Sequence, residues 1–213
     1  ARYAGRVEGR RADAADAASL EAALSGVDLV AVAASVLKHA GTVAEAALRA
    51  GADYFDLLLS SPAKLDALER LRPRIEAEGR CFVTDGGIHP GLAAVMVRAL
   101  APRFARPERA AIGALMQVDW NACDFSLSTM EEFAAEMRDY RTEALRDGRW
   151  EAVPSRAATR SFDFGLPWGR RPGFLMSLEE IRRLPQAVPS LRSCGFYVAG
   201  FNPVVDYVVM PAG

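Results

Sequence analysis

One stretch of the sequence places an ionisable ring in a backbone that can approach a ligand closely. Residues 81–92 read CFVTDGGIHPGL, so His89 follows two glycines and precedes Pro90. An imidazole can give or take a proton near neutral pH, as general acid–base catalysis requires. We therefore predict that His89 is a catalytic acid–base residue, and that Thr84 and a second catalytic candidate, Asp85, orient it. The alternative interpretation is that the imidazole only hydrogen-bonds the glycine loop and fixes its shape.

The glycines of this loop favour a ligand site at the end of a strand. Gly86, Gly87 and Gly91 lack the Cβ atom that forbids some backbone angles and close approaches. The apolar run before them and the helical spacing of Leu92–Leu100 predict a strand, a small-residue loop and a helix. Open α/β sheets bind ligands at the carboxyl ends of their strands. We therefore predict that Thr84, Gly86 and Gly87 contact a bound ligand.

Strand and helix patterns alternate before and through this loop. Helices are predicted to end at Gly26, Gly51 and Gly79, and Asp16 is predicted to cap the first of them. The expected strands are Val7–Asp13, Asp28–Ala34, Asp53–Leu59 and Arg80–Asp85. This alternation predicts right-handed connections and a parallel sheet. A continuous apolar run such as Asp28–Ala34 further predicts a strand that is buried on both faces.

The pattern changes after Pro102 and Pro107, which bracket a predicted linker. The elements expected beyond it are strands at Ala110–Val118, Arg149–Val153 and Thr159–Phe164, a helix at Thr129–Leu145, and a Gly/Pro-rich loop at Gly165–Gly173. These patterns are typical of an α+β domain with a mainly antiparallel sheet. We therefore predict two domains, residues 1–106 and 107–213, and expect the last residues of the chain to pack back on the first domain.

Composition and charge exclude several classes of protein. The 213 residues are 51% hydrophobic and 25% charged, which is typical of a soluble globular chain, and the net charge of −1 argues against nucleic-acid binding. The three cysteines are odd in number and lack metal-ligand spacing, so we predict a reducing, cytoplasmic compartment and no metal site. No apolar run approaches the roughly 18 residues of a membrane span, and we predict no membrane partner.

Four segments, in this order, resemble the saccharopine dehydrogenase-like oxidoreductases. They are DLVAVAAS at 28–35, KHAG at 38–41, AALRAGADYFD at 46–56 and GGIHPG at 86–91. The chain departs from the family at three places. Ser35-Val36 replaces the Gly-Pro that commonly follows the second motif, and no acidic residue follows the Tyr-x-Asp strand. The third departure is that no G-x-G-x-x-G occurs in the sequence.

The resemblance implies an NAD(P)-dependent oxidoreductase built on a Rossmann-like domain, with NADP slightly preferred to NAD. The expected substrate is a small amino- or keto-acid-like molecule, and a homodimer is an expected assembly. Because family members hold the pyrophosphate with a G-x-G-x-x-G at a helix N-terminus, we expect that half of the domain to lie before Ala1. The 213 residues alone are therefore not expected to bind a dinucleotide through a glycine-rich pyrophosphate loop.

The resemblance also implies cofactor-binding residues at the ends of the first strands. Asp13 lies where related folds contact the adenine ring, and its alternative interpretation is a helix cap beside Asp16. Ala33, Ala34 and Ser35 are expected over the ribose and phosphates, because small side chains let a cofactor approach the backbone. Their alternative interpretation is close packing of a strand end on a helix.

Lys38 and His39 follow that strand, and the resemblance places them near the nicotinamide. Lys38 is a catalytic candidate that would orient a substrate carboxylate or transfer a proton, as would His39. The alternative interpretation is a pair of solvated surface residues.

Two other functions remain open at this point. The first is a non-catalytic Rossmann-like scaffold that binds a nucleotide or dimerises through the sheet of its second domain. The second is carbon–nitrogen chemistry that resembles homospermidine synthase and needs an active lysine. Only Lys38 and Lys64 are available in the sequence, and Lys38 is the candidate for that role.

Overall fold

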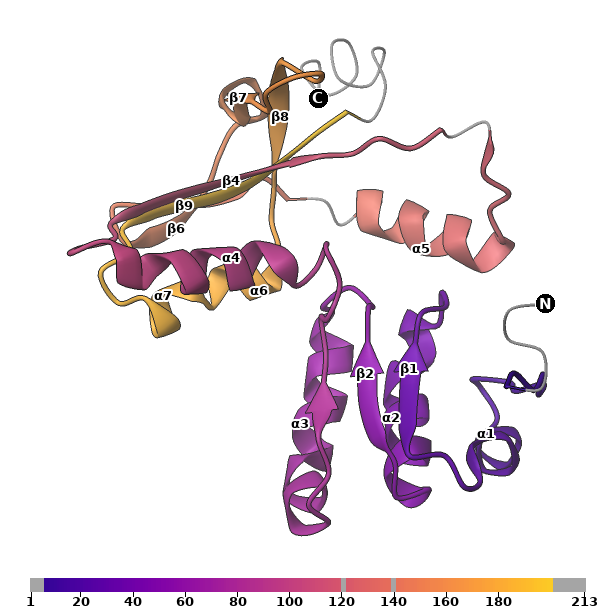
Figure 1. The fold of residues 1–213 in the computed structure, drawn as a ribbon. Helices are drawn as coiled ribbons and strands as arrows, with labels where there is room; N and C mark the ends of the chain where they lie inside the picture. Colours follow the sequence, from indigo (N-terminus) through magenta and orange to yellow (C-terminus); the bar gives the residue numbers. More distant parts are fainter. Residues whose placement is uncertain (1–5, 120–121, 139–140, 201–213) are drawn as a thin grey trace. The chain divides into compact units, whose positions relative to one another are not determined.

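The structure, a computed structural model, describes residues 6–119, 122–138 and 141–200. By their contacts the residues form two compact units that divide between Gly87 and Ile88, coloured indigo to magenta and magenta to yellow in Figure 1. The domain boundary predicted at residues 106 and 107 stays a prediction. The division by contacts lies earlier because helix α4 (Leu92–Leu100) packs through Ala93 into the core of the second unit.

The first unit is a three-stranded parallel sheet with helices between its strands. Its elements are α1 (Ala17–Leu24), β1 (Leu29–Val32), the short 3₁₀ helix at Leu37–His39, α2 (Ala40–Arg49), β2 (Asp53–Asp56), α3 (Pro62–Ala77) and β3 (Phe82–Val83). The strand order is β1-β2-β3, and the register aligns Val30 with Tyr54 and Tyr54 with Phe82. This confirms the parallel sheet that the alternating pattern predicts. Asp16 caps α1 as predicted, by accepting a hydrogen bond from the Ala18 N–H.

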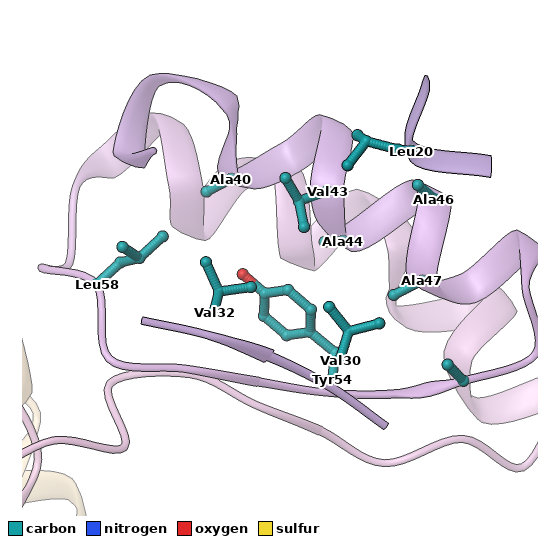
Figure 2. Packing of buried hydrophobic residues seen from close by; sticks show 11 residues of the cluster. Leu20, Val30, Val32, Ala40, Val43, Ala44, Ala46, Ala47, Tyr54 and Leu58 are labelled. Carbon is teal, nitrogen blue, oxygen red and sulfur yellow. The ribbon is translucent and has the colours of Figure 1, made fainter. Parts of the chain in front are cut away.

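The core of the first unit lies on one face of this sheet. Val30, Val32 and Tyr54 are buried beside the alanines of α2, with Leu20 of α1 and Leu58 in the same cluster (Figure 2). Partly buried leucines of α3 pack against it. On the opposite face Leu29 is 56% exposed and Val83 is 44% exposed. The prediction that Asp28–Ala34 is buried on both faces is therefore wrong for the described residues. The reason is that α1, α2 and α3 all pack on the same face.

The strand predicted at Val7–Asp13 is absent from the described part of the chain. Residues 7–13 are irregular and exposed, and the sheet order places no strand beside β1 other than β2. Arg10 instead donates hydrogen bonds to Glu8 and to the carbonyl oxygens of Ala23 and Ser25. A strand pattern without a neighbouring strand to pair with does not form a ladder, so the local signal alone was insufficient.

The second unit contains a six-stranded, mainly antiparallel sheet, as predicted. Its strands are β4 (Arg109–Leu115), β5 (Glu143–Arg146), β6 (Arg149–Ala152), β7 (Thr159–Asp163), β8 (Arg170–Met176) and β9 (Ser193–Ala199). Its helices are α4, α5 (Leu127–Arg138), α6 (Glu179–Arg182) and α7 (Leu184–Ala187), with short 3₁₀ turns at Ala101–Arg103 and Ser155–Ala157. β4 runs parallel to β9 along its whole length (Figure 1). β5 and β8 pair antiparallel with β9, β5 at Cys194 and β8 at Phe196–Val198.

The helix predicted at Thr129–Leu145 is too long. α5 ends at Arg138, and Glu143–Arg146 forms strand β5, which pairs with β6 through Arg146 and Arg149. Asp147 and Gly148 join these strands with φ values of 47° and 82°. An Asp-Gly pair with two positive φ angles is a favoured two-residue hairpin turn, and that signal outweighs the helical spacing of the residues before it.

The predicted loop Gly165–Gly173 is shorter than expected. β8 begins at Arg170 and pairs with β7 from Asp163, so only the residues between these two positions form the connection. The core of this unit lies between the sheet and α4, α6 and α7, and its largest buried members include Leu145, Phe196 and Leu184.

Candidate functional site

The carboxyl ends of β2 and β3 and the start of α3 form a polar cluster within the first unit. β2 ends at Asp56, and the turn after it leads into α3, whose N-cap is Ser61. The Ser61 hydroxyl accepts a hydrogen bond from the Lys64 N–H, and Pro62 occupies the first helical turn, where its missing N–H is not needed. This local geometry places Lys64 close to the ends of both strands.

Lys64 is the centre of the cluster. Its side chain is 0% exposed, and its ammonium donates to Asp56 Oδ1 at 3.1 Å, to Asp85 Oδ1 at 2.7 Å and to the Leu58 carbonyl oxygen at 2.7 Å. An ammonium has three N–H donors, so these acceptors satisfy all of them. Lys64 therefore joins the residues that follow β2 to the residues that follow β3.

Asp56 is buried with a side chain that is 0% exposed. Its Oδ1 atom accepts from the N–H groups of Leu58 and Asp85 as well as from Lys64, and its Oδ2 atom accepts from the Thr84 hydroxyl at 2.9 Å. A buried carboxylate is costly unless it is paired and hydrogen-bonded, and Asp56 has both kinds of partner. Thr84, predicted to contact a ligand, thus donates its hydroxyl to Asp56.

Asp85 occupies an unusual backbone conformation at the exit of β3. Its φ angle is 59°, in the left-handed region that a non-glycine residue adopts only at a cost on the order of 1–3 kcal/mol. Lys64 holds one carboxylate oxygen, and the Ser60 hydroxyl donates a hydrogen bond to the other. The Asp85 side chain remains 16% exposed.

The cluster combines two carboxylates with a single ammonium, so its formal charge is negative. Tyr54 lies next to it on β2, with a buried hydroxyl that finds no hydrogen-bond partner among the described residues. Burial, and then the negative charge of Asp56, raises the pKa of the Tyr54 phenol. The phenol therefore stays protonated across the physiological range.

Gly86 is required by a close contact. Its N–H donates to the Asp56 carbonyl oxygen at 2.8 Å, and a Cβ atom at this position would lie 2.2 Å from Cε2 of the Phe55 ring. Any side chain here would displace that ring or the turn. Gly87 follows as the last residue of the first unit.

His89 belongs to the second unit, at the entrance to α4. Its Nε2 atom is buried without a hydrogen-bond partner in the described part of the chain, and its ring centroid lies 5.3 Å from that of Phe196. Burial lowers the pKa of the His89 imidazole. A neutral imidazole with an unused nitrogen can accept or relay a proton once a partner reaches it. Asp85 and Thr84 direct their hydrogen bonds to Asp56, Lys64 and Ser60 within the first unit.

The structure places Asp13 before α1, in a local turn. Its Oδ1 atom accepts from the Ala15 N–H at 2.9 Å, and its own N–H donates to the Ser19 hydroxyl at 2.9 Å. These contacts match the alternative interpretation, in which Asp13 acts beside Asp16 at the start of the helix. Its predicted role at an adenine ring stays a prediction.

The residues after β1 lie at the carboxyl end of that strand. Ala33 and Ala34 are exposed and Ser35 is half-buried. Lys38 is exposed, and the half-buried His39 occupies the N-cap position of α2 without making a capping hydrogen bond from its side chain. Their assigned roles in binding and catalysis stay predictions.

Sequence reasoning missed Lys64, Asp56 and Ser60. Lys64 is one of two lysines in a chain whose other cations are all arginines, and that exception was the available signal. Asp56 closes the Tyr-x-Asp segment that contributes to the family resemblance. Lys64 reaches Asp56 only after the chain turns from β2 into α3, and Lys64 and Ser60 meet at Asp85, which follows β3.

The described residues contain neither a candidate membrane span nor a candidate metal site. Within the described ranges no helix is both long and apolar enough to cross a membrane. Those same ranges bring no three His, Cys, Asp or Glu side chains together as candidate metal ligands.

The similarity of this chain to known proteins lies in its fold. No protein-family model matches the sequence, and no curated protein matches it significantly. Among solved structures it is similar to the apo, histidine-tagged saccharopine dehydrogenase (L-Glu forming) from Saccharomyces cerevisiae, with a TM-score of 0.62 and 17% identity over 88% of this chain. A putative oxidoreductase from Klebsiella pneumoniae matches with a TM-score of 0.39 and 13% identity, over 87% of this chain and 48% of that one.

The chain spans 43% of the length of the saccharopine dehydrogenase structure. The resemblance predicted from the four sequence segments is thereby confirmed for the fold. The likeness to the Klebsiella protein is too distant to support an argument.

Proposed function

We propose that this chain is part of an NAD(P)-dependent oxidoreductase of saccharopine dehydrogenase-like type. The observation that carries the proposal is the likeness of its fold to a saccharopine dehydrogenase over 88% of its residues. The order of the four sequence segments supports the same function independently of the fold. The proposed substrate is a small amino- or keto-acid-like molecule, with NADP preferred to NAD.

The proposed reaction transfers one hydride, which carries two electrons, and releases one proton. A nicotinamide cofactor, when bound, would serve as the hydride acceptor for oxidation of the substrate carbon that bears the amino or hydroxyl group. The proton on the substrate nitrogen or oxygen then needs an acceptor, and a new C=N or C=O double bond forms. We assign the proton to Nε2 of His89, because this nitrogen is unpaired within the described residues and burial lowers the pKa of the ring.

The residues of this chain suit contact with the nicotinamide half of such a cofactor better than contact with its pyrophosphate. Ala33 and Ala34 are small and exposed at the end of β1. These features suit close approach of the nicotinamide half. The sequence contains no G-x-G-x-x-G with which to bind the pyrophosphate.

We propose different tasks for the two predicted catalytic residues at the ends of the strands. Both carboxylate oxygens of Asp85 already accept hydrogen bonds, so it suits holding the turn better than taking up a proton. The exposed Lys38 suits an electrostatic contact with a substrate carboxylate. A homodimer in the cytoplasm remains the proposed setting.

A cofactor titration tests this function directly. The full-length protein that carries this chain is titrated with NADPH and NADH while the nicotinamide fluorescence is followed. We expect saturable binding of at least one of them, with NADPH the tighter. No fluorescence change at millimolar cofactor would rule out the proposal.

The second candidate function is a non-catalytic scaffold that binds a nucleotide or dimerises through the sheet of its second domain. The saturated contacts of Lys64 favour it, because a fully bonded lysine resembles a structural element rather than a reactive one. Replacing His89 by Ala separates the two functions. A scaffold would keep its function in His89→Ala, whereas the oxidoreductase would lose turnover while remaining folded.

A further inference from the structure

Lys64 and its partners fix the conformation of the turn after β3. The Asp85 backbone is left-handed, with φ at 59°, and its carboxylate is held from both sides by Lys64 and Ser60. Left-handed non-glycine residues persist where surrounding contacts over-determine them. Here those contacts come from residues that follow a different strand.

The next residue is fixed by the same partners. The Gly86 N–H donates to the Asp56 carbonyl oxygen, and its Cα atom lies against the Phe55 ring. Lys64 in turn bonds the Asp56 carboxylate at 3.1 Å. The contacts that hold residues 85 and 86 therefore lead back to the ends of β2 and the ammonium of Lys64.

We propose that Lys64 is a positioning residue that holds the Asp85–Gly86 turn in the geometry a nicotinamide cofactor needs. This inference rests on the proposed function. Without the ammonium, the Asp56 and Asp85 carboxylates are two like charges close together with only hydrogen-bond donors to oppose them. The turn then loses the contact that offsets its backbone strain, and the Gly86 backbone moves away from its place at the end of β3.

The main test compares four variants of the full-length protein. Lys64→Met removes the ammonium and keeps the length of the side chain. Ser60→Ala removes the uncharged donor of the two contacts to Asp85 and serves if Lys64→Met does not fold. The double variant Lys64→Met/Asp85→Gly removes the repelling carboxylate and supplies a residue that adopts a positive φ freely. Arg72→Met is the matched control, because it removes an exposed cation from the same helix.

The measurement is the Kd for the nicotinamide cofactor, at a temperature where circular dichroism shows each variant folded. Kd is chosen over turnover because Asp85 is itself a predicted catalytic residue. We expect Lys64→Met to weaken binding on the order of tenfold to a hundredfold, the scale of a misplaced positioning group. Ser60→Ala shifts Kd less in the same direction, and Arg72→Met leaves it unchanged.

The double variant separates positioning from general loss of stability. We expect it to bind the cofactor more tightly than Lys64→Met alone, since glycine relieves the strain at position 85. A folded Lys64→Met or Ser60→Ala with wild-type affinity overturns the proposal, as does a double variant that recovers nothing.

A second readout keeps this inference distinct from the proposed function. If the wild-type protein binds no nicotinamide cofactor, the proposed function fails, and hydrogen exchange of the Gly86 amide then tests the positioning role. Faster exchange in Lys64→Met that slows again in the double variant supports it. Unchanged exchange in Lys64→Met overturns it.

Discussion

Asp85 and His89 lie four positions apart in the sequence and are held in opposite ways. Asp85 makes hydrogen bonds or ion pairs through both carboxylate oxygens and through its N–H group. His89 packs its ring against Phe196, and its buried Nε2 atom has no partner within the described residues. One residue is fixed by polar contacts in the first unit, and the other is fixed by packing in the second.

The difference shows how burial acts on a charge and on a neutral ring. A buried carboxylate keeps its charge only when cations and donors replace water, so its surroundings become a saturated network. A buried imidazole loses its charge instead, because desolvation lowers its pKa, and its nitrogen stays available. The first arrangement suits a rigid turn, and the second suits a group that exchanges a proton.

The largest effect is expected from removing the ammonium of the network. Lys64→Met leaves the buried Asp56 carboxylate and the part-buried Asp85 carboxylate without their cation, which costs about 3–5 kcal/mol in the free energy of unfolding. The exposed pair of Arg72 and Glu69 provides the contrast, and Arg72→Met is expected to leave stability nearly unchanged, because solvent screens an exposed ion pair. Denaturant unfolding of both variants measures the difference, and equal effects would contradict the structural role of the network.

Crowding the turn is expected to have the next largest effect. Gly86→Ala places a Cβ atom 2.2 Å from the Phe55 ring and is expected to cost about 1–3 kcal/mol. Gly9→Ala is the matched control, because nothing lies within 4 Å of a Cβ atom there. Adding Phe55→Leu to Gly86→Ala should restore part of the loss. If it restores nothing, the clash with this ring is not the cause.

Protonation of the His89 imidazole is expected to have a smaller effect on stability, and this effect depends on pH. Because burial lowers the folded-state pKa of His89, the unfolded chain binds the proton more readily between that value and the unfolded pKa of about 6.5. His89 therefore leaves stability unaffected above about pH 6.5 and reduces it as the pH falls below that value. We expect His89→Gln to lose less stability than the wild type when the pH falls from about 7.5 to about 5. A wild type that gains stability on acidification relative to His89→Gln would show a raised pKa instead.

The smallest effect is expected from labelling the cysteine thiols, which leaves the fold intact and reports on the two units separately. Burial raises the pKa of the Cys194 thiol to about 12, whereas Cys81 and Cys123 are exposed. A thiol reagent is therefore expected to modify Cys81 and Cys123 while Cys194 remains protected. Because Cys194 packs in the same core as Phe196, it should stay protected in Lys64→Met if the damage is confined to the first unit. Rapid labelling of Cys194 in that variant would show that the damage spreads.

The sequence predicted the elements whose signals are local. The parallel strands and their helices followed from apolar runs that end at glycine, and Asp16 was identified as a cap from its position alone. The antiparallel character of the second sheet was also predicted. The boundaries failed where a long-range partner decides the outcome, as in the strand expected at Val7–Asp13, or where a turn signal was overlooked, as at Asp147.

For the candidate site, the sequence by itself determined the loop around Gly86 and His89 and the small residues at the end of β1. Their types and spacing carry this information, because glycine and proline restrict the backbone wherever they occur. Only the tertiary structure decided that Lys64 joins Asp56 to Asp85 and that His89 packs against Phe196 in the other unit. Such pairings depend on which strand ends lie side by side, and that follows from the sheet rather than from neighbours in the chain.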